Sequence, residues 1–214
     1  MIEDNTMNTQ TQAQPLQIDQ LVLDSLGQMT GAEDLQNLLQ KAVPSAAIQD
    51  TGVRISLPFG REAWGQLVAG LETLYGLDGA YGLCIQTGQV FFNAYYRQYA
   101  QQTGFLEREF RMLPKPQRIQ KGLELLSGAF NRILPGLEAS VWEDETGWFW
   151  QVKDTAGLLA QATGAAFLQW FVIGVIQEFL SWTSGGKVYP VQAASRDNGA
   201  VPGMLLHIEK HYLG

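Results

Sequence analysis

The sequence predicts an α+β fold in which N-terminal helices are followed by an antiparallel sheet packed with a long buried helix. Three observations carry this prediction. The first half repeats apolar residues at helical spacing, alternation replaces that pattern near residue 140, and a long uncharged apolar stretch separates two sets of strand-like segments. Hydrophobic residues are 46% of the chain and aromatic residues 11%, which is ample for the core of one domain with extensions.

The N-terminal part divides into a tail and a helical extension. Residues 1–15 are polar and are expected to be disordered, whereas residues 16–58 contain two helical patterns. We expect the first helix to end near Gly27. Thr30, followed three residues later by Glu33, is typical of a capping box and predicts the start of the second helix.

A strongly helical pattern begins at Arg61. Gly76 and Gly79 are expected to break it, and a second helix then runs through the tyrosine-rich stretch that follows. Gly82 and Gly88 have no side chain, so they are expected to let this helix approach another one closely.

The rest of the chain changes from helix to strand and back. A further helix is predicted between Pro116 and Pro135, and a hairpin with its turn near Thr146–Gly147 follows. Residues 165–182 predict a long helix with a narrow polar stripe, which indicates burial on most sides. After Gly185–Gly186, a closing hairpin completes the sheet.

Charge and cysteine content exclude several functions. The net charge is −7, with 21 acidic and 14 basic residues and no basic stripe, which argues against nucleic-acid binding. The single cysteine, Cys84, excludes an internal disulfide framework and a cysteine-rich zinc site, and it favours a reducing, cytoplasmic compartment. The uncharged run 155–177 contains glycines and glutamines, and its strongly apolar part is shorter than a membrane span. We therefore expect at most peripheral membrane association.

Catalytic residues are scarce in this sequence. In a strand from Met204 to Tyr212, His207 and His211 would share one side, where they could hold a metal or donate an axial ligand, or be two solvated histidines. Cys84 lies between apolar neighbours, which favours a buried thiol over a nucleophile. We therefore predict neither catalytic nor metal-binding residues.

Three stretches resemble the 4-vinyl-reductase domain, a hydrocarbon-binding family related in fold to the subunits of the TRAPP vesicle-tethering complex. They are GLDGAYGLCIQTGQVFF, GFLEREFRMLPKPQRIQKGLELL and GVIQEFLSWTSGGKVYPVQAASRDNGAVPGMLLHI. The resemblance implies a TRAPP-subunit-like domain over residues 59–214. The family's closing loop carries cysteines, which here fall on Ser195 and near Gly203, so its metal ligands are absent.

The resemblance implies a function in tetrapyrrole biology. Some family members are linked to bacteriochlorophyll synthesis, and this acidic, cysteine-poor sequence is similar to a cyanobacterial branch tied to photosystem assembly. We expect noncatalytic binding of a hydrophobic ligand, a chlorophyll precursor or a bilin, in photosystem II assembly or chlorophyll handling. Such a protein could lie on the thylakoid membrane and act with photosystem assembly proteins.

The expected ligand pocket lies between the tyrosine-rich helix and the apolar helix, with tryptophans of the hairpin as walls. Its predicted residues are Phe92, Tyr95, Tyr96, Tyr99, Trp148, Trp150, Phe167, Trp170 and Phe171. Two alternatives remain open. The same aromatic faces could bury the interface of a scaffold that forms a homodimer or a heterodimer with a paralogue, or the chain could be a vinyl reductase, although no dinucleotide-binding pattern is present.

Overall fold

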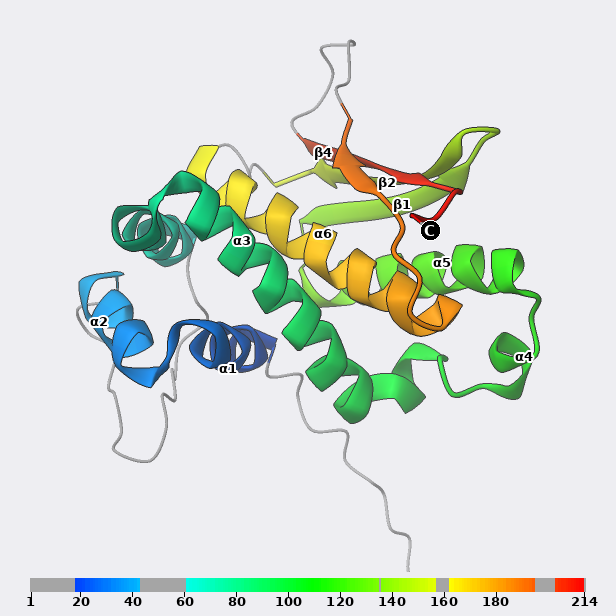
Figure 1. Cartoon of the computed structure of the whole chain (residues 1–214), viewed down its shortest axis with the longest axis horizontal. Helices are drawn as coiled ribbons and strands as arrows, with labels where there is room; N and C mark the ends of the chain where they lie inside the picture. The colour runs from blue at the N-terminus through cyan, green and yellow to red at the C-terminus, as the bar shows by residue number, and fades with distance from the viewer. Residues whose placement is uncertain (1–17, 43–60, 135, 157–161, 195–202, 214) are drawn as a thin grey trace, which may run out of the picture.

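The computed structural model confirms the α+β fold. Its helices lie on one side of a four-stranded antiparallel sheet (Figure 1). The predicted disordered tail lies outside the described residues, which are 18–42, 61–134, 136–156, 162–194 and 203–213.

The order of elements follows the prediction, with helices first and one long helix between the two pairs of strands. Helices α5 and α6 pack against the sheet, α3 packs along α6, and α1 and α2 lie against α3 (Figure 1). The elements are α1 (Ile18–Thr30), α2 (Ala32–Ala42), α3 (Arg61–Thr103), α4 (Arg108–Arg111), α5 (Lys115–Ile133), β1 (Leu137–Glu143), β2 (Gly147–Asp154), α6 (Ala162–Ser184), β3 (Val191–Ala193) and β4 (Gly203–Glu209).

The boundary between α1 and α2 differs from the prediction. Helix α1 continues past Gly27 to Thr30, whose hydroxyl donates to the carbonyl oxygen of Leu26 at 3.1 Å. Thr30 therefore belongs to the last turn of α1, and its prediction as the N-cap of α2 was wrong. Gly31, at φ 89°, makes the break instead, because a left-handed backbone strongly favours glycine.

Helices α1 and α2 share a separate apolar cluster with the N-terminal part of α3. The predicted break in α3 is a kink at Gly76, at φ 72°, while Gly79 stays helical. Leu74 and Tyr75, just before the kink, are exposed rather than buried. The cluster consists of Leu23, Leu26, Leu35, Leu38, Leu39, Leu67, Leu71 and Ala80.

Helix α6 is apolar around most of its surface because it lies between α3 and the sheet. Gly174 and Ile176 are buried, and Phe179 and Leu180 are completely inaccessible. Among the described residues, no helix is long and apolar enough to cross a bilayer.

The sheet has the strand order β1-β2-β4-β3, and every neighbouring pair is antiparallel. Alternation along the strands sends Trp150 and Leu206 toward the helices, and Phe149 and His207 to the opposite face. The predicted hairpins are thus confirmed, with β1 and β2 forming the first and β3 and β4 the second.

Candidate functional site

Five aromatic side chains of α3 and α6 form a continuous line through the core, which we call the aromatic row. Successive ring centroids are 5.8, 5.1, 5.7 and 5.2 Å apart. In order along the row, the residues are Phe167, Phe171, Phe91, Tyr95 and Tyr99, and each is at most 8% exposed. The structure thus brings together four residues of the predicted pocket and adds Phe91.

Tyr95 gives the aromatic row a polar group. Burial raises the pKa of its phenol, while the charge of Arg132 and a hydrogen bond with that side chain act in the opposite direction. Arg132 lies in the last turn of α5 and is exposed to solvent. A buried phenol is therefore paired with a guanidinium that also reaches water.

Trp148 and Trp150 project from β2 toward the helices and are only 4% and 2% exposed. The Trp150 ring packs at 6.3 Å from Phe130 on α5, and the Trp148 ring at 6.5 Å from Tyr189. Neither indole N–H has a hydrogen-bond acceptor within the described part of the chain. An unsatisfied buried N–H costs about 1–3 kcal/mol, so the pair favours a bound group with acceptor oxygens.

The other predicted pocket residues lie elsewhere. Phe92 and Tyr96 belong to a second cluster, in which Tyr96 lies 4.7 Å from Trp182. Trp170 is partly buried against the main core and stacks on Tyr81 at 5.0 Å. The further members of the second cluster are Phe105, Phe110 and Phe179. The nine predicted residues therefore do not line one site.

Glycines bring α3 and α6 into backbone contact. A Cβ atom on Gly88 would lie 2.1 Å from the carbonyl oxygen of Phe171, and one on Gly174 would lie 2.0 Å from that of Ile85. The predicted close approach is therefore confirmed for Gly88, but around Gly82 the space is open. Gly88 therefore faces α6 of its own chain.

The two histidines are not on one strand face. Strand β4 ends at Glu209, so His211 lies beyond it and is exposed. His207 lies on the outer face of the sheet, with its ring 4.8 Å from that of Phe149, which in turn stacks on Trp142 at 5.4 Å. In the described part of the chain, no three His, Cys, Asp or Glu residues are grouped to hold a metal ion.

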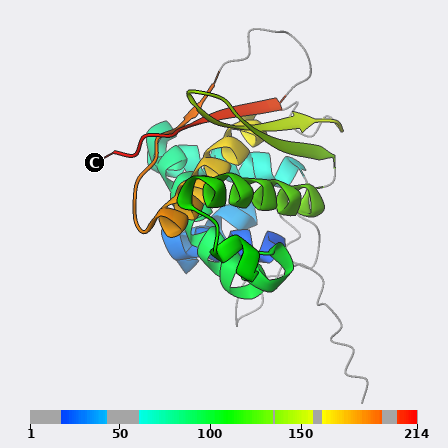
Figure 2. The ribbon, with the colours of Figure 1, turned by 90° about the vertical axis from the view of Figure 1, so that its right-hand side faces the viewer.

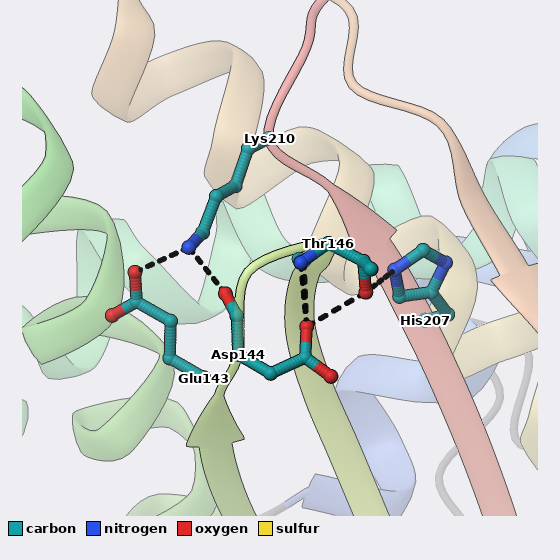
Figure 3. Close-up of polar contacts among 6 residues, drawn as sticks. Glu143, Asp144, Thr146, His207 and Lys210 are labelled. Atoms are coloured by element: carbon teal, nitrogen blue, oxygen red, sulfur yellow. Dashed lines mark hydrogen bonds and ion pairs between the residues drawn. The ribbon is translucent and has the colours of Figure 1, made fainter.

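The acidic turn between β1 and β2 is built by its own hydrogen bonds (Figure 3). The Asp144 carboxylate accepts from the backbone N–H and the hydroxyl of Thr146, both at 2.7 Å, and these bonds lower the pKa of Asp144. Lys210 pairs with Glu143 at 2.8 Å, and the Thr146 hydroxyl lies 3.4 Å from Nε2 of His207. These contacts close the turn between β1 and β2.

Cys84 is completely buried on α3, and burial raises the pKa of its thiol to about 12. The thiol is therefore neutral at physiological pH, which disfavours a role as a nucleophile.

Several solved structures share this fold over most of their length. One similar structure, from work on modulating heme redox potential through protein-induced porphyrin distortion, has a TM-score of 0.57 and 9% identity over 90% of this chain and 97% of that chain. An oxygen-binding H-NOX domain related to soluble guanylate cyclases, in its oxygen complex, has a TM-score of 0.55 and 11% identity over 91% of this chain and 94% of that chain. The Fe(II) unliganded H-NOX protein from K. algicida has a TM-score of 0.53 and 12% identity over 91% of this chain and 96% of that chain.

These likenesses show a shared fold over nearly the whole of both chains, but not a shared ligand. No family model and no curated protein matches the sequence. The resemblance to 4-vinyl-reductase domains therefore stays a prediction.

The residues present do not fit a heme iron held by histidine or thiolate. Protein ligands of heme iron are typically histidine, cysteine thiolate, methionine or tyrosine. His207 and His211, the two histidines of the chain, both lie outside the core, and Cys84 carries a neutral thiol. Among the described residues, the buried side chains of the other two ligand types are Tyr95, Tyr99, Tyr189 and Met204.

Proposed function

We propose that this chain binds a tetrapyrrole-class ligand without catalysing a reaction on it. The ligand lies between the sheet and the helices, beside Trp148 and Trp150, in the core that also contains the aromatic row. The observation that carries the proposal is the pair of buried indole N–H groups without acceptors. The fold shared with heme-binding proteins supports the ligand class.

The chemistry of the site favours a ligand with a flat apolar body and acceptor oxygens at its edge. The rings of Phe91 and Phe171 provide apolar contacts, and the indole N–H groups of β2 provide donors for carboxylate or carbonyl oxygens. The Tyr95–Arg132 pair offers a second donor position for an acidic side group. In this proposal the ligand is a bilin or a chlorophyll precursor, which needs no axial histidine.

The same proposal includes a role in photosystem II assembly or chlorophyll handling. This part is supported by the resemblance of the chain to 4-vinyl-reductase domains. A chain that binds a pigment noncatalytically would carry it to assembling proteins or keep it from reacting.

Replacement of Trp150 by phenylalanine tests the proposed role of the indole N–H. The substitution keeps an aromatic ring and removes the donor. We expect the dissociation constant for biliverdin or free-base protoporphyrin IX to rise at least about tenfold, because a hydrogen bond to a charged acceptor contributes about 1.5–3 kcal/mol. Quenching of tryptophan fluorescence and the absorption change of the ligand measure the affinity.

The matched control is Trp142→Phe, because Trp142 lies on the outer face of the sheet and is 38% exposed. It should leave affinity unchanged. Equal affinities for the wild type and the folded Trp150→Phe variant would remove the ligand from this position. If both proteins bind the ligand saturably with equal affinity, the ligand class is retained and the binding site lies elsewhere in the chain.

A further inference from the structure

One end of the molecule brings together α4, the start of α5, the end of α6 and the C-terminal segment (Figures 1 and 2). Contacts among these elements hold the end together. Arg118 donates from Nη2 to the carbonyl oxygen of Thr183 at 2.9 Å, and Val188 pairs with Leu213 through a β-bridge. Figure 2 views this end face-on, and we call it the terminal surface.

The terminal surface exposes an unusual number of large apolar side chains. Six of the ten exposed large hydrophobic residues in the described part of the chain lie here. Their exposed fractions run from 38% to 74%, and they come from separate segments. They are Leu106, Met112, Trp182, Val188, Tyr212 and Leu213.

The terminal surface is also basic, although the chain is acidic. Between Leu106 and Glu124 there are five basic and three acidic residues, a local charge of +2 in a chain of net charge −7. Nζ of Lys187 lies 3.3 Å from the centre of the Tyr212 ring. The interaction with Lys187, together with the charge of Lys115, lowers the pKa of Tyr212.

We infer that the terminal surface binds to membranes that contain anionic lipids. Its positive charge complements anionic headgroups, while the negative charge of the remaining chain turns the rest of the molecule away from them. Exposed apolar tips such as Met112 and Leu213 enter the interfacial layer, and the long stems of Arg111 and Lys115 keep their charges at the headgroups.

A membrane fits these observations better than an acidic protein does. The apolar side chains stand on separate segments and are interspersed with lysine, a residue type that is depleted in protein interfaces. A bilayer accommodates scattered apolar tips without a matching groove. This inference does not depend on the proposed ligand.

Flotation of the full chain with vesicles tests the inference. Wild-type protein should float with mixed phosphatidylcholine–phosphatidylglycerol vesicles and stay behind with pure phosphatidylcholine. The double variant Arg111→Glu/Lys115→Glu should bind the mixed vesicles at least about tenfold more weakly, because each basic residue near an anionic surface contributes about fivefold. Met112→Ser should reduce the binding that survives at high salt.

The matched control is Lys41→Glu/Lys153→Glu, which makes the same change of net charge at exposed positions on α2 and on the outer face of β2. It should retain binding. The inference is wrong if wild-type protein ignores the mixed vesicles, or if both double variants lose binding equally. It is also wrong if the chain binds polyglutamate but not the mixed vesicles, since the surface would then belong to an acidic protein.

Discussion

Asn131 protects the edge of the sheet with its side-chain amide. Its Nδ2 donates to the carbonyl oxygen of Ala139 at 3.0 Å, and its Oδ1 accepts from the N–H of Ala139 at 2.6 Å. The side chain thus replaces one residue of a missing neighbouring strand and ties β1 to α5.

Asn131→Ala should lower the free energy of unfolding by about 1–3 kcal/mol, because it leaves a donor and an acceptor of Ala139 without partners. Urea denaturation measures the loss. Asn93→Ala removes an exposed amide that bonds to Glu178, and it should cost about 0.5 kcal/mol or less. If the two variants are equally stable, the amide of Asn131 does not stabilise the sheet edge.

At the scale of single residues, the sequence predicted that the candidate site is aromatic, but it did not predict which aromatic residues lie together. Aromatic richness correctly indicated a core of stacked rings. Phe91 and Phe92 are adjacent in sequence, but each residue turns a helix by about 100°, so they enter different clusters. The rotation of α3 against α6 decides which ring meets which, and it depends on backbone contact at Gly88.

At the scale of elements, the contact between α3 and α6 depends on two glycines that lie against carbonyl oxygens. Gly88→Ala should lower the free energy of unfolding by about 1–3 kcal/mol or more, since its Cβ atom would meet backbone that has to move. Thermal or urea unfolding measures the change.

Gly82→Ala is the control on the same helix, because nothing lies within 4 Å of a Cβ atom there. It should raise stability by about 0.5–1 kcal/mol, since alanine favours a helix. A Gly88→Ala variant that is as stable as Gly82→Ala would contradict the close contact between the helices.

Most elements could be predicted because their periods are long and regular. Helix α5 and the hairpin of β1 and β2 fall where the apolar spacing placed them. Short elements and helix ends could not be predicted in the same way. Helix α4 has only four residues, too few to show a helical period. The break between α1 and α2 falls at Gly31 rather than Thr30 because of the backbone angle of Gly31, which the apolar spacing does not reveal.

At the scale of the whole molecule, the proposed ligand site and the terminal surface occupy different regions. The aromatic row and the inner face of β2 lie within the main core, whereas the terminal surface lies at the end where α4 and α5 meet the C-terminal segment (Figure 1). The charge of the chain is therefore unevenly distributed, with a basic segment in an acidic protein.

The measurement that tests the central claim most directly is the absorption spectrum of the purified chain during titration with biliverdin and with free-base protoporphyrin IX. The account predicts a saturable shift of the ligand band at one ligand per chain, with both ligands recovered unchanged. No saturable shift with either ligand would contradict tetrapyrrole binding, and chemical conversion of a bound ligand would contradict a noncatalytic role.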